Sequence, residues 1–233
     1  MAPADIRKEG SSYDLTIAIG VMAAGELITT DLLAETIIMG ELSLDGSILP
    51  IKGALPIAIQ AQKDGFKRLI VPCENAREAA IVKDVEVYGM ENLKDVVALL
   101  EGTKKFDKTE VNPRDDFAEG IQNLTYDFSD VKGQENIKRA MEIAAAGGHN
   151  IILIGPPGAG KTMLAKRLNT ILPPMNLYEA LETTKIHSVA GRLGTNASLM
   201  AQRPFRSPHH TISDVALVGG GNHPQPGEIS LAH

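Results

Sequence analysis

Eight consecutive residues form the pattern in this sequence that is best suited to chemistry, a glycine-rich loop that ends in lysine and threonine. The loop consists of Gly155, Pro156, Pro157, Gly158, Ala159, Gly160, Lys161 and Thr162. It matches the spacing G-x-x-x-x-G-K-[ST] of a phosphate-binding loop (P-loop) at every fixed position. Glycines let backbone N–H groups approach phosphate oxygens, because no side chain blocks the way. A chance glycine-rich turn is the alternative, but the pattern favours a loop that binds ATP.

Two side chains of the P-loop and the segments around it have specific roles in this prediction. Lys161 is expected to reach the β- and γ-phosphates of ATP, and the Thr162 hydroxyl is expected to ligate Mg²⁺. Residues 150–154 before the loop are apolar except for the first, which predicts a strand buried on both faces of a parallel sheet. Residues 163–172 after it predict a helix, which Pro173 stops. A strand, a loop and a helix in this order form the setting that a phosphate site requires.

Hydrolysis of ATP needs more than a phosphate-binding loop. An acidic residue at the end of a second apolar strand helps to hold Mg²⁺, and a further residue orients the attacking water. The acidic residues after the P-loop are Glu179, Glu182, Asp214 and Glu228. None of the four ends an apolar strand, and no arginine after the loop stands in a recognisable catalytic setting. We therefore predict no catalytic residue in this chain, and we expect it to be a fragment of a longer protein.

The first hundred residues alternate between short strands and helices, which predicts an α/β or α+β unit. The expected strands are 36–39, a hairpin over 41–51, 68–72 and 85–88, and the expected helices are 13–24, 53–64, 76–82 and 93–100. Asp45-Gly46 is a strong signal for the hairpin turn, and Ser12 is placed to cap the first helix. A further helix is expected over residues 134–146, where two glycines would end it.

Residues 101–125 are polar and show no sustained periodicity, which indicates a linker. The predicted domains are therefore residues 1–100 and residues 126–233. Charge divides unevenly between them, because residues 1–100 contain nine Lys and Arg but fifteen Asp and Glu. This acidity argues against nucleic-acid binding by the first domain through charge alone.

The composition excludes several classes of protein. With 43% hydrophobic residues among 233, the chain can form a packed core. No apolar run reaches the length that crosses a bilayer, and the N-terminus lacks the apolar region of a secretory signal. The one cysteine, Cys73, rules out an intramolecular disulfide. These features together favour a cytoplasmic protein.

Several segments beyond the P-loop resemble the AAA+ ATPases related to magnesium-chelatase subunit I. In the second domain they are residues 131–134 (VKGQ), 203–211 (RPFRSPHHT), 219–221 (GGG) and 226–233 (PGEISLAH). In the first domain, residues 4–15 and 40–46 resemble the Lon-like domain that precedes the ATPase in the ComM (YifB) branch of that family. The resemblance implies a partial Lon-like α+β domain, followed by part of an α/β AAA+ domain with a parallel sheet. It also implies a chain that continues at both ends.

The resemblance carries expectations about function. It implies an ATP-driven, homo-oligomeric ring, hexameric in the full-length protein, with ATP and Mg²⁺ as cofactors. Members of the ComM branch are linked to branch migration of recombining DNA during natural transformation, whereas chelatase relatives use ATP to insert Mg²⁺ into a porphyrin. The Lon-like part favours a ComM-type motor, with DNA as a partner and no membrane. Two alternatives stay open: a chelatase-type ATPase that acts on a protein partner, and a nucleotide-binding fragment without turnover.

The Lon-like resemblance raises the question of a protease. Lon proteases use a serine activated by a lysine of lowered pKa. By the resemblance, Ser12 stands at the place of the serine, but Leu55 stands at the place of the lysine and cannot accept a proton. Lys52 is close, but it comes three residues early. We therefore predict no peptidase activity.

The segment around His209 and His210 admits three interpretations. Adjacent histidines without a nearby cysteine form a poor zinc site, so a metal role is disfavoured. Together with Arg203 and Arg206, they could form a loop that touches DNA or a neighbouring subunit. The third interpretation is a structural loop whose path is fixed by prolines.

Overall fold

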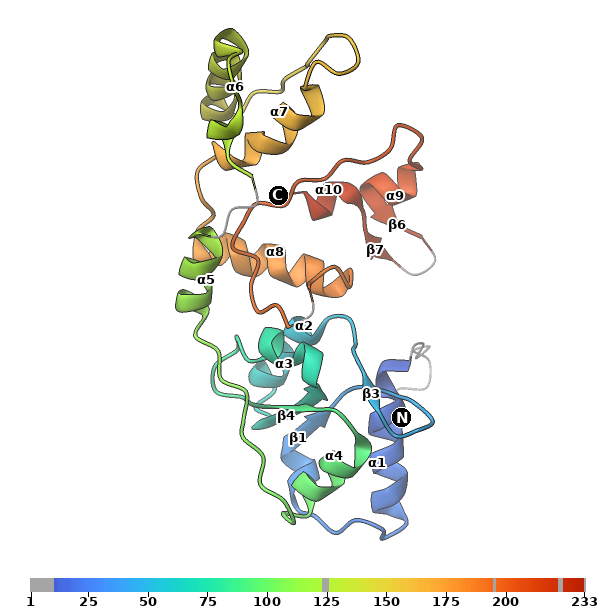
Figure 1. Ribbon diagram of the computed structural model, residues 1–233. Helices are drawn as coiled ribbons and strands as arrows, with labels where there is room; N and C mark the ends of the chain where they lie inside the picture. The colour runs from blue at the N-terminus through green and yellow to red at the C-terminus, as the bar shows by residue number, and fades with distance from the viewer. Residues whose placement is uncertain (1–10, 123–125, 195, 222–223, 233) are drawn as a thin grey trace. The chain divides into compact units, whose positions relative to one another are not determined.

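A computed structural model describes residues 11–122, 126–194, 196–221 and 224–232. The chain divides into two compact units (Figure 1). The first comprises the described residues up to Pro113 together with residues 184–199, and the second comprises residues 114–183 together with the described residues from Met200 on. Residues 184–199 thus belong to the first unit, although they follow the P-loop in the sequence. The division into domains at residues 1–100 and 126–233 stays a prediction.

The first unit is built on a parallel sheet of three strands, in the order β1–β4–β5. These strands are β1 (Thr36–Ile38), which the 3₁₀ helix η2 (Leu32–Glu35) precedes, β4 (Arg68–Pro72) and β5 (Glu86–Met90). Ile38 pairs with Ile70, and Ile70 with Tyr88. Every residue of β4 except Arg68 is buried, as expected for a central strand covered on both faces. The alternation of helices with a parallel sheet confirms the predicted α/β class.

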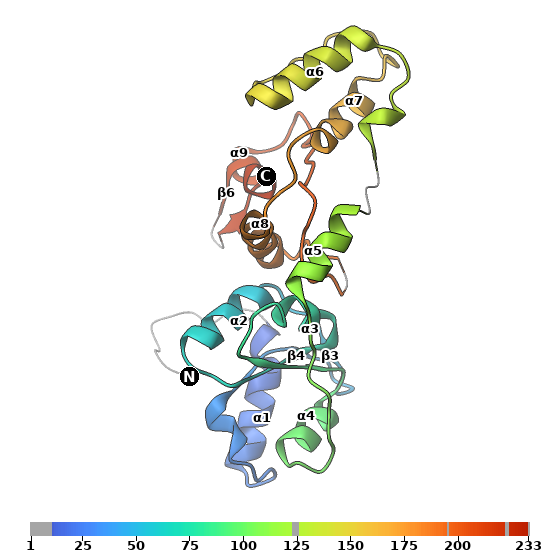
Figure 2. The ribbon, with the colours of Figure 1, turned by 90° about the vertical axis from the view of Figure 1, so that its left-hand side faces the viewer.

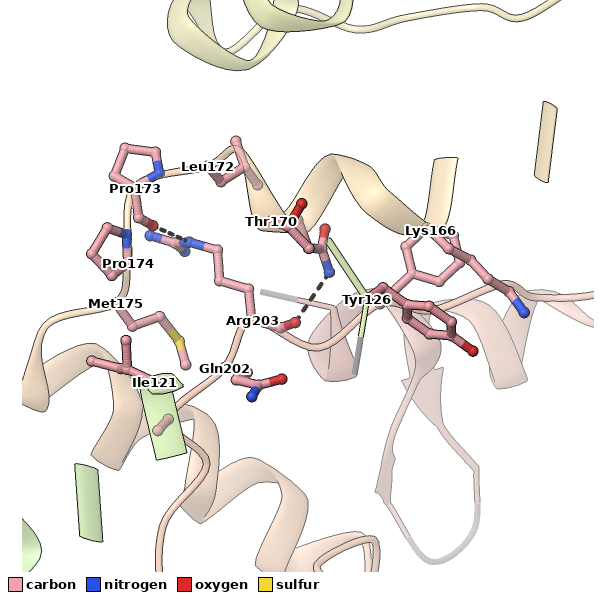
Figure 3. A pocket seen from close by; sticks show the side chains of 13 residues that line it. Ile121, Tyr126, Lys166, Thr170, Leu172, Pro173, Pro174, Met175, Gln202 and Arg203 are labelled. Atoms are coloured by element: carbon pink, nitrogen blue, oxygen red, sulfur yellow. Dashed lines mark hydrogen bonds between the residues drawn. The ribbon is translucent and has the colours of Figure 1, made fainter. Parts of the chain in front are cut away.

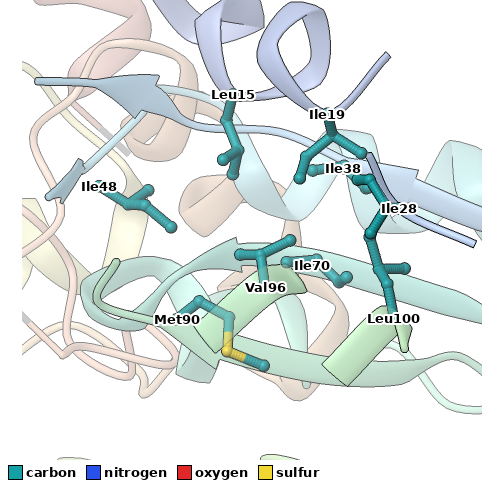
Figure 4. Close-up of a cluster of buried hydrophobic side chains, with 9 residues drawn as sticks. All are labelled: Leu15, Ile19, Ile28, Ile38, Ile48, Ile70, Met90, Val96 and Leu100. Atoms are coloured by element: carbon teal, nitrogen blue, oxygen red, sulfur yellow. The ribbon is translucent and has the colours of Figure 1, made fainter. Parts of the chain in front are cut away.

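Two pairs of helices cover the two faces of this sheet (Figure 2). One face is covered by α1 (Asp14–Ala24) and α4 (Leu93–Leu100), and the other by α2 (Ala54–Lys63) and α3 (Cys73–Ala79). The core under α1 and α4 is entirely hydrophobic (Figure 4); its buried members are Leu15, Ile19, Ile28, Ile38, Ile48, Ile70, Met90, Val96 and Leu100. Burial of this apolar surface stabilises the unit. All four helices lie within a few residues of their predicted bounds.

The predicted hairpin is confirmed. Strands β2 (Glu41–Leu42) and β3 (Ile48–Leu49) pair in antiparallel orientation. In the turn between them, Gly46 has a φ of +87°, which favours glycine because other residues carry a Cβ. The Asp45 carboxylate accepts a hydrogen bond from the Ser47 backbone N–H at 2.9 Å, which fixes the turn further.

The prediction that Ser12 caps the first helix is wrong. Tyr13 holds the N-cap position of α1, and no side chain caps the helix. Ser12 lies instead in a short 3₁₀ helix, η1 (Ser11–Tyr13). Its carbonyl accepts a hydrogen bond from the Gly40 N–H at 2.9 Å, and the Leu15 N–H donates to the Gly40 carbonyl at 3.1 Å. Since the backbone at Gly40 satisfies a donor of the first turn, that donor needs no side-chain cap.

The second unit is mainly helical. Its elements are α5 (Pro113–Gln122), η3 (Phe128–Asp130), α6 (Glu135–Gly147), α7 (Lys161–Arg167), η4 (Leu168–Thr170), the first part of α8 (Leu177–Val189), α9 (Asp214–Val218), β6 (Gly219–Gly220), β7 (Gln225–Pro226) and α10 (Glu228–Leu231). The helix predicted over 134–146 is confirmed as α6, which ends where Gly148 adopts a φ of +62°. Helix α5 lies inside the segment predicted as a linker. None of the helices in the described parts of the chain is long and apolar enough to cross a membrane.

The strand predicted over residues 150–154 is not formed. Residues 151–154 have no regular secondary structure, and Ile152 and Ile154 are 80% and 88% exposed. Their apolar pattern is that of a buried strand, but a strand forms only by pairing with a neighbour. In the described residues of this unit, the only strands are β6 and β7, which pair with each other. Residues 150–154 therefore have no strand to pair with.

Candidate nucleotide-binding site

Residues 155–160 form a mostly exposed loop that leads directly into α7. Gly158 and Gly160 each have a φ of +81°, in the left-handed region that residues with a Cβ rarely adopt. Gly160 holds the N-cap position of α7. The Ala159 N–H donates to the Pro156 carbonyl at 3.3 Å, which closes a turn within the loop. Two of the glycines in the motif thus stand where the backbone conformation requires glycine.

Lys161 is the first residue of α7, and its side chain folds back onto the loop. Its Nζ donates to the carbonyls of Gly155 and Pro156, at 2.7 Å each. An ammonium group has three N–H donors, so two of them hold the loop closed on itself. Thr162 follows with an exposed side chain. The predicted residues 155–162 therefore form one continuous loop and helix start, which the Lys161 side chain ties together.

A small hydrophobic core fixes α7 behind the loop. It consists of Val131, Met141 from α6 and Leu164 from α7, which are 2%, 0% and 1% exposed. Gln134, the N-cap residue of α6, lies beside the loop: its amide nitrogen is 3.9 Å from the position that a Cβ on Gly160 would take. Gln134 was not predicted as a site residue. Its place in a segment that resembles the AAA+ family is the signal that could have found it.

The C-terminal end of α7 is tied to the segment that precedes α6. Arg167 donates from Nε to the Asp127 carbonyl and from Nη2 to the Asp130 carboxylate, both at 3.1 Å. Its guanidinium also lies 5.1 Å from the centre of the Tyr126 ring, in cation–π contact. Asp127 caps η3 by accepting the Ser129 N–H at 2.7 Å, and this bond lowers the pKa of the Asp127 carboxyl. The helix after the P-loop is thus held at both ends.

Two of the acidic residues after the P-loop are engaged by arginines. Arg206 forms a bidentate pair with Glu228, at 2.5 Å from Nε and 2.6 Å from Nη2. The hydrogen bonds that Arg206 donates to the Glu228 carboxylate raise the pKa of Arg206, although partial burial opposes this. Glu179 accepts the Asn176 N–H at 2.9 Å and lies 3.6 Å from Nη2 of Arg203. These carboxylates therefore hold chain segments together within the second unit.

Side chains of the segment 203–211 contact other parts of the second unit and one another. Arg203 donates from Nε to the Pro173 carbonyl at 3.0 Å, in addition to its pair with a carboxylate. The rings of His209 and His210 lie 4.2 Å apart between centroids. In the parts of the chain that the structure describes, no group of three or more His, Cys, Asp and Glu side chains could hold a metal ion.

A cavity of about 470 Å³ lies beside this segment, within the second unit (Figure 3). Its walls include the apolar side chains of Met175 and Phe205 and the polar ends of Tyr126, Lys166 and Arg203. The sequence carries no local signal for this cavity, because its walls come from segments that are far apart along the chain.

The residues considered for a Lon-type dyad all lie in the first unit. Ser12 lies in η1, and Leu55, which stands at the place of the lysine, is fully buried near the start of α2. Lys52 is exposed, and its methylene groups lie within 3.2 Å of the position that a Cβ on Gly191 would take. The absence of peptidase activity stays a prediction.

Comparison with known proteins connects both units to one family. Residues 127–233 match the family model described as magnesium chelatase, subunit ChlI, and residues 1–75 match a second one described as subunit ChlI of Mg-chelatase. The chain is 46% identical over 233 residues to the uncharacterized protein YifB of Escherichia coli K12, and 43% identical over 232 residues to the competence protein ComM of Haemophilus influenzae. The chain belongs to the magnesium-chelatase subunit ChlI family.

Within this family the chain is a ComM/YifB-like AAA+ protein, as the resemblance implied. The alignments with YifB and ComM cover 100% of this chain but 45% of each relative, so the chain spans less than half of their length. The chain is also 34% identical over 98 residues to Lon protease 1 of Thermus thermophilus, which covers 40% of this chain and 12% of that protease. The expected Lon-like similarity is therefore confirmed.

Proposed function

We propose that this chain is the nucleotide-binding part of a ComM-type motor, a homo-hexameric AAA+ ring that uses ATP to branch-migrate or remodel DNA during recombination. The observation that carries the proposal is the P-loop, with glycines at two positions of positive φ and Lys161 bound inside it. The AAA+ family supports ATP and Mg²⁺ as cofactors. The competence protein among the relatives supports the ComM branch.

The hydrogen bonds of Lys161 suggest how ATP would enter. In the nucleotide-free loop its ammonium group is bound to two neutral carbonyls, those of Gly155 and Pro156. Phosphate oxygens carry negative charge, and their hydrogen bonds to an ammonium group are shorter and stronger. The β- and γ-phosphates would therefore take Lys161 from the carbonyls and open the loop.

The side chain of Thr162 fits a role at the metal ion. Thr162 is an exposed residue next to the loop, and Mg²⁺ prefers oxygen ligands together with phosphates and water. Bound Mg²⁺ would neutralise negative charge on the phosphates. Thr162 would hold the ion while Lys161 holds the phosphates.

The first experiment tests nucleotide binding by this chain. Lys161→Ala is expected to abolish detectable binding of a fluorescent ATP analogue, because hydrogen bonds to charged groups contribute about 1.5–3 kcal/mol each. Lys166→Ala is the matched control, since Lys166 is exposed on the same helix and outside the loop. Unchanged ATP affinity in the Lys161 variant would show that the P-loop assignment is wrong.

A chelatase-type ATPase that acts on a protein partner is the second candidate, favoured by the chelatase family match over residues 127–233. ATP turnover of the full-length protein, measured with and without branched DNA, separates the two. Stimulation by DNA supports the motor, whereas turnover indifferent to DNA supports the chelatase type. Phosphate release by the 233-residue chain alone would contradict the third possibility, a fragment that binds nucleotide without turnover.

A further inference from the structure

A second cavity, of about 270 Å³, lies entirely within the first unit. Its walls are formed by the residues just before α2, by one side of α3, and by Ser188, Gly191, Leu193, Gly194 and Ala197. Five polar side chains are among them: Lys52, Glu74, Asn75, Glu78 and Ser188. The P-loop contributes nothing to this cavity, so it is independent of the nucleotide site.

Two buried oxygen atoms of this cavity lack hydrogen-bond partners. Glu78 is 4% exposed; its Oε1 accepts the Asn75 amide at 2.7 Å, but its Oε2 has no partner among the described residues. Ser188 is 3% exposed, and its hydroxyl is unpartnered in the same way. Leaving a buried polar group unsatisfied costs about 1–3 kcal/mol. Two such groups in the wall of one cavity therefore indicate that something else supplies their partners.

The neighbours of Glu78 cannot fill this role. The Asn75 side chain is fully used, because its amide oxygen accepts the Ile51 N–H and its amide nitrogen donates to the Ile51 carbonyl, both at 2.9 Å. Burial raises the pKa of Glu78. Hydrogen bonding from the Asn75 amide, the Ser188 hydroxyl and the Leu55 backbone N–H lowers this pKa in turn, but no described residue reaches Oε2 with the distance and angle of a full hydrogen bond. Glu78 is thus a buried acid without a positive partner.

The charge of the surroundings favours a positively charged occupant. Residues 1–100 contain nine Lys and Arg but fifteen Asp and Glu, and Glu74 lines the cavity together with Glu78. Lys52 is the basic residue of its wall; this side chain is exposed, with its stem against Gly191. Lys52 would compete with a cation that enters from outside.

We propose that this cavity binds an organic cation, a guanidinium or primary ammonium group, which pairs with the carboxylate of Glu78 and donates a second hydrogen bond to the Ser188 hydroxyl. Such a group supplies the charge and the donors that the two open oxygens lack. The cation can come from a free alkylamine or alkylguanidine, or from an arginine or lysine side chain of a polypeptide. Both sources present the same chemistry to Glu78.

Titration of the 233-residue protein with n-butylguanidinium, followed by calorimetry, tests the pairing. n-Butylurea is the neutral probe of nearly the same shape, and its affinity is expected to be lower by about tenfold or more. Glu78→Gln keeps the size of the side chain and should weaken butylguanidinium binding by about tenfold. Lys52→Met keeps the stem against Gly191 but removes the competing charge, so it should tighten binding.

A second titration, with a short peptide, identifies the source of the cation. Acetyl-Gly-Arg-Gly-amide is compared with the same peptide carrying citrulline, the neutral analogue of arginine. Tighter binding of the arginine peptide than of butylguanidinium assigns the cavity to a polypeptide side chain, and equal or weaker binding assigns it to a small amine or guanidine.

Three results would overturn the proposal: no binding of butylguanidinium or of the arginine peptide at millimolar concentration, equal binding of butylguanidinium and butylurea, or undiminished binding by Glu78→Gln. Circular dichroism checks that each variant is folded. Lys161→Ala should bind butylguanidinium as the unchanged protein does, because the nucleotide site lies in the other unit.

Discussion

At the scale of single residues, two ionisable side chains have hydrogen-bonding atoms that a charged ligand would engage. Lys161 places two of its N–H donors on neutral carbonyls of its own loop. Glu78 keeps one carboxyl oxygen without a partner in a buried setting. An oppositely charged group would form stronger hydrogen bonds with Lys161 than the two neutral carbonyls do. At Glu78 it would supply the hydrogen bond that the second carboxyl oxygen lacks. The two proposed sites lie in different units and would recognise groups of opposite charge.

Glu78→Gln is expected to raise the stability of the ligand-free protein at neutral pH. Burial raises the pKa of Glu78 in the folded state, so the folded protein retains this proton at pH values where the unfolded chain has released it. Below the unfolded pKa of Glu78, both states hold the proton and the carboxyl does not lower the stability. As the pH rises from there toward the folded pKa, the free energy of unfolding falls. Glutamine does not ionise, so the melting temperature of the variant should exceed that of the unchanged protein at about pH 8 and converge with it near pH 4.

Differential scanning fluorimetry at the two pH values measures this effect. Glu74→Gln is the matched control, because Glu74 is exposed on the same helix. A constant difference between the melting temperatures of the Glu78 variant and the unchanged protein at both pH values would contradict a pKa of Glu78 that burial raises.

At the scale of elements, strand β5 and helix α3 meet at a point without room for a side chain. A Cβ on Gly89 of β5 would stand 2.8 Å from the Ala76 Cβ and 3.1 Å from the Cys73 Cα, both in α3. Because the second of these is a backbone atom, α3 would have to move away from the sheet. Gly20 in α1 differs, since a Cβ there would meet nothing within 4 Å. Replacing glycine by alanine would therefore cause a clash at Gly89 but none at Gly20.

Gly89→Ala is expected to destabilise the first unit by about 1–3 kcal/mol, the usual cost of overpacking. Gly20→Ala is expected to stabilise it by about 0.5–1 kcal/mol, because alanine has the higher helix propensity and the site is open. Urea unfolding of the two variants beside the unchanged protein measures both free energies. A Gly89 variant as stable as the unchanged protein would show that α3 packs less closely on β5 than the structure shows.

At the scale of the whole molecule, the chain returns from the second unit to the first. The segment 184–199 packs within the first unit, where the Ser188 carbonyl accepts the Gly53 N–H at 3.0 Å. This segment also closes the cavity around Glu78. The first unit is therefore completed by residues that follow the P-loop in the sequence.

Gly191→Ala tests this return of the chain. Gly191 has a φ of +65°, and a Cβ there would meet the Lys52 stem at 2.8 Å. The left-handed conformation costs an alanine about 1–2 kcal/mol, so hydrogen exchange of the Gly53 amide should become about tenfold faster. Gly194→Ala is the control, because the nearest atom to a Cβ there is 4.0 Å away. Equal exchange rates in both variants would show that the segment does not hold the Gly53 amide.

The sequence by itself determined the local features of this protein. The hairpin at Asp45-Gly46 and the helix over 93–100 were predicted and are confirmed, because turn chemistry and hydrophobic period act between near neighbours. The assignment of residues 155–162 as a P-loop stays a prediction from motif spacing. Family membership also followed from short segments whose residue types were distinctive.

Only the tertiary structure decided the rest. Residues 150–154 read as a buried strand but lack a pairing partner among the described residues. Ser12 reads as a cap, but the backbone of Gly40 satisfies a donor of that first turn. The cavity at Glu78 exists because Ser188 and its neighbours pack beside α3, which no local pattern indicates. Pairing and burial depend on which distant segments meet, and the order of residues along a short window does not contain that information.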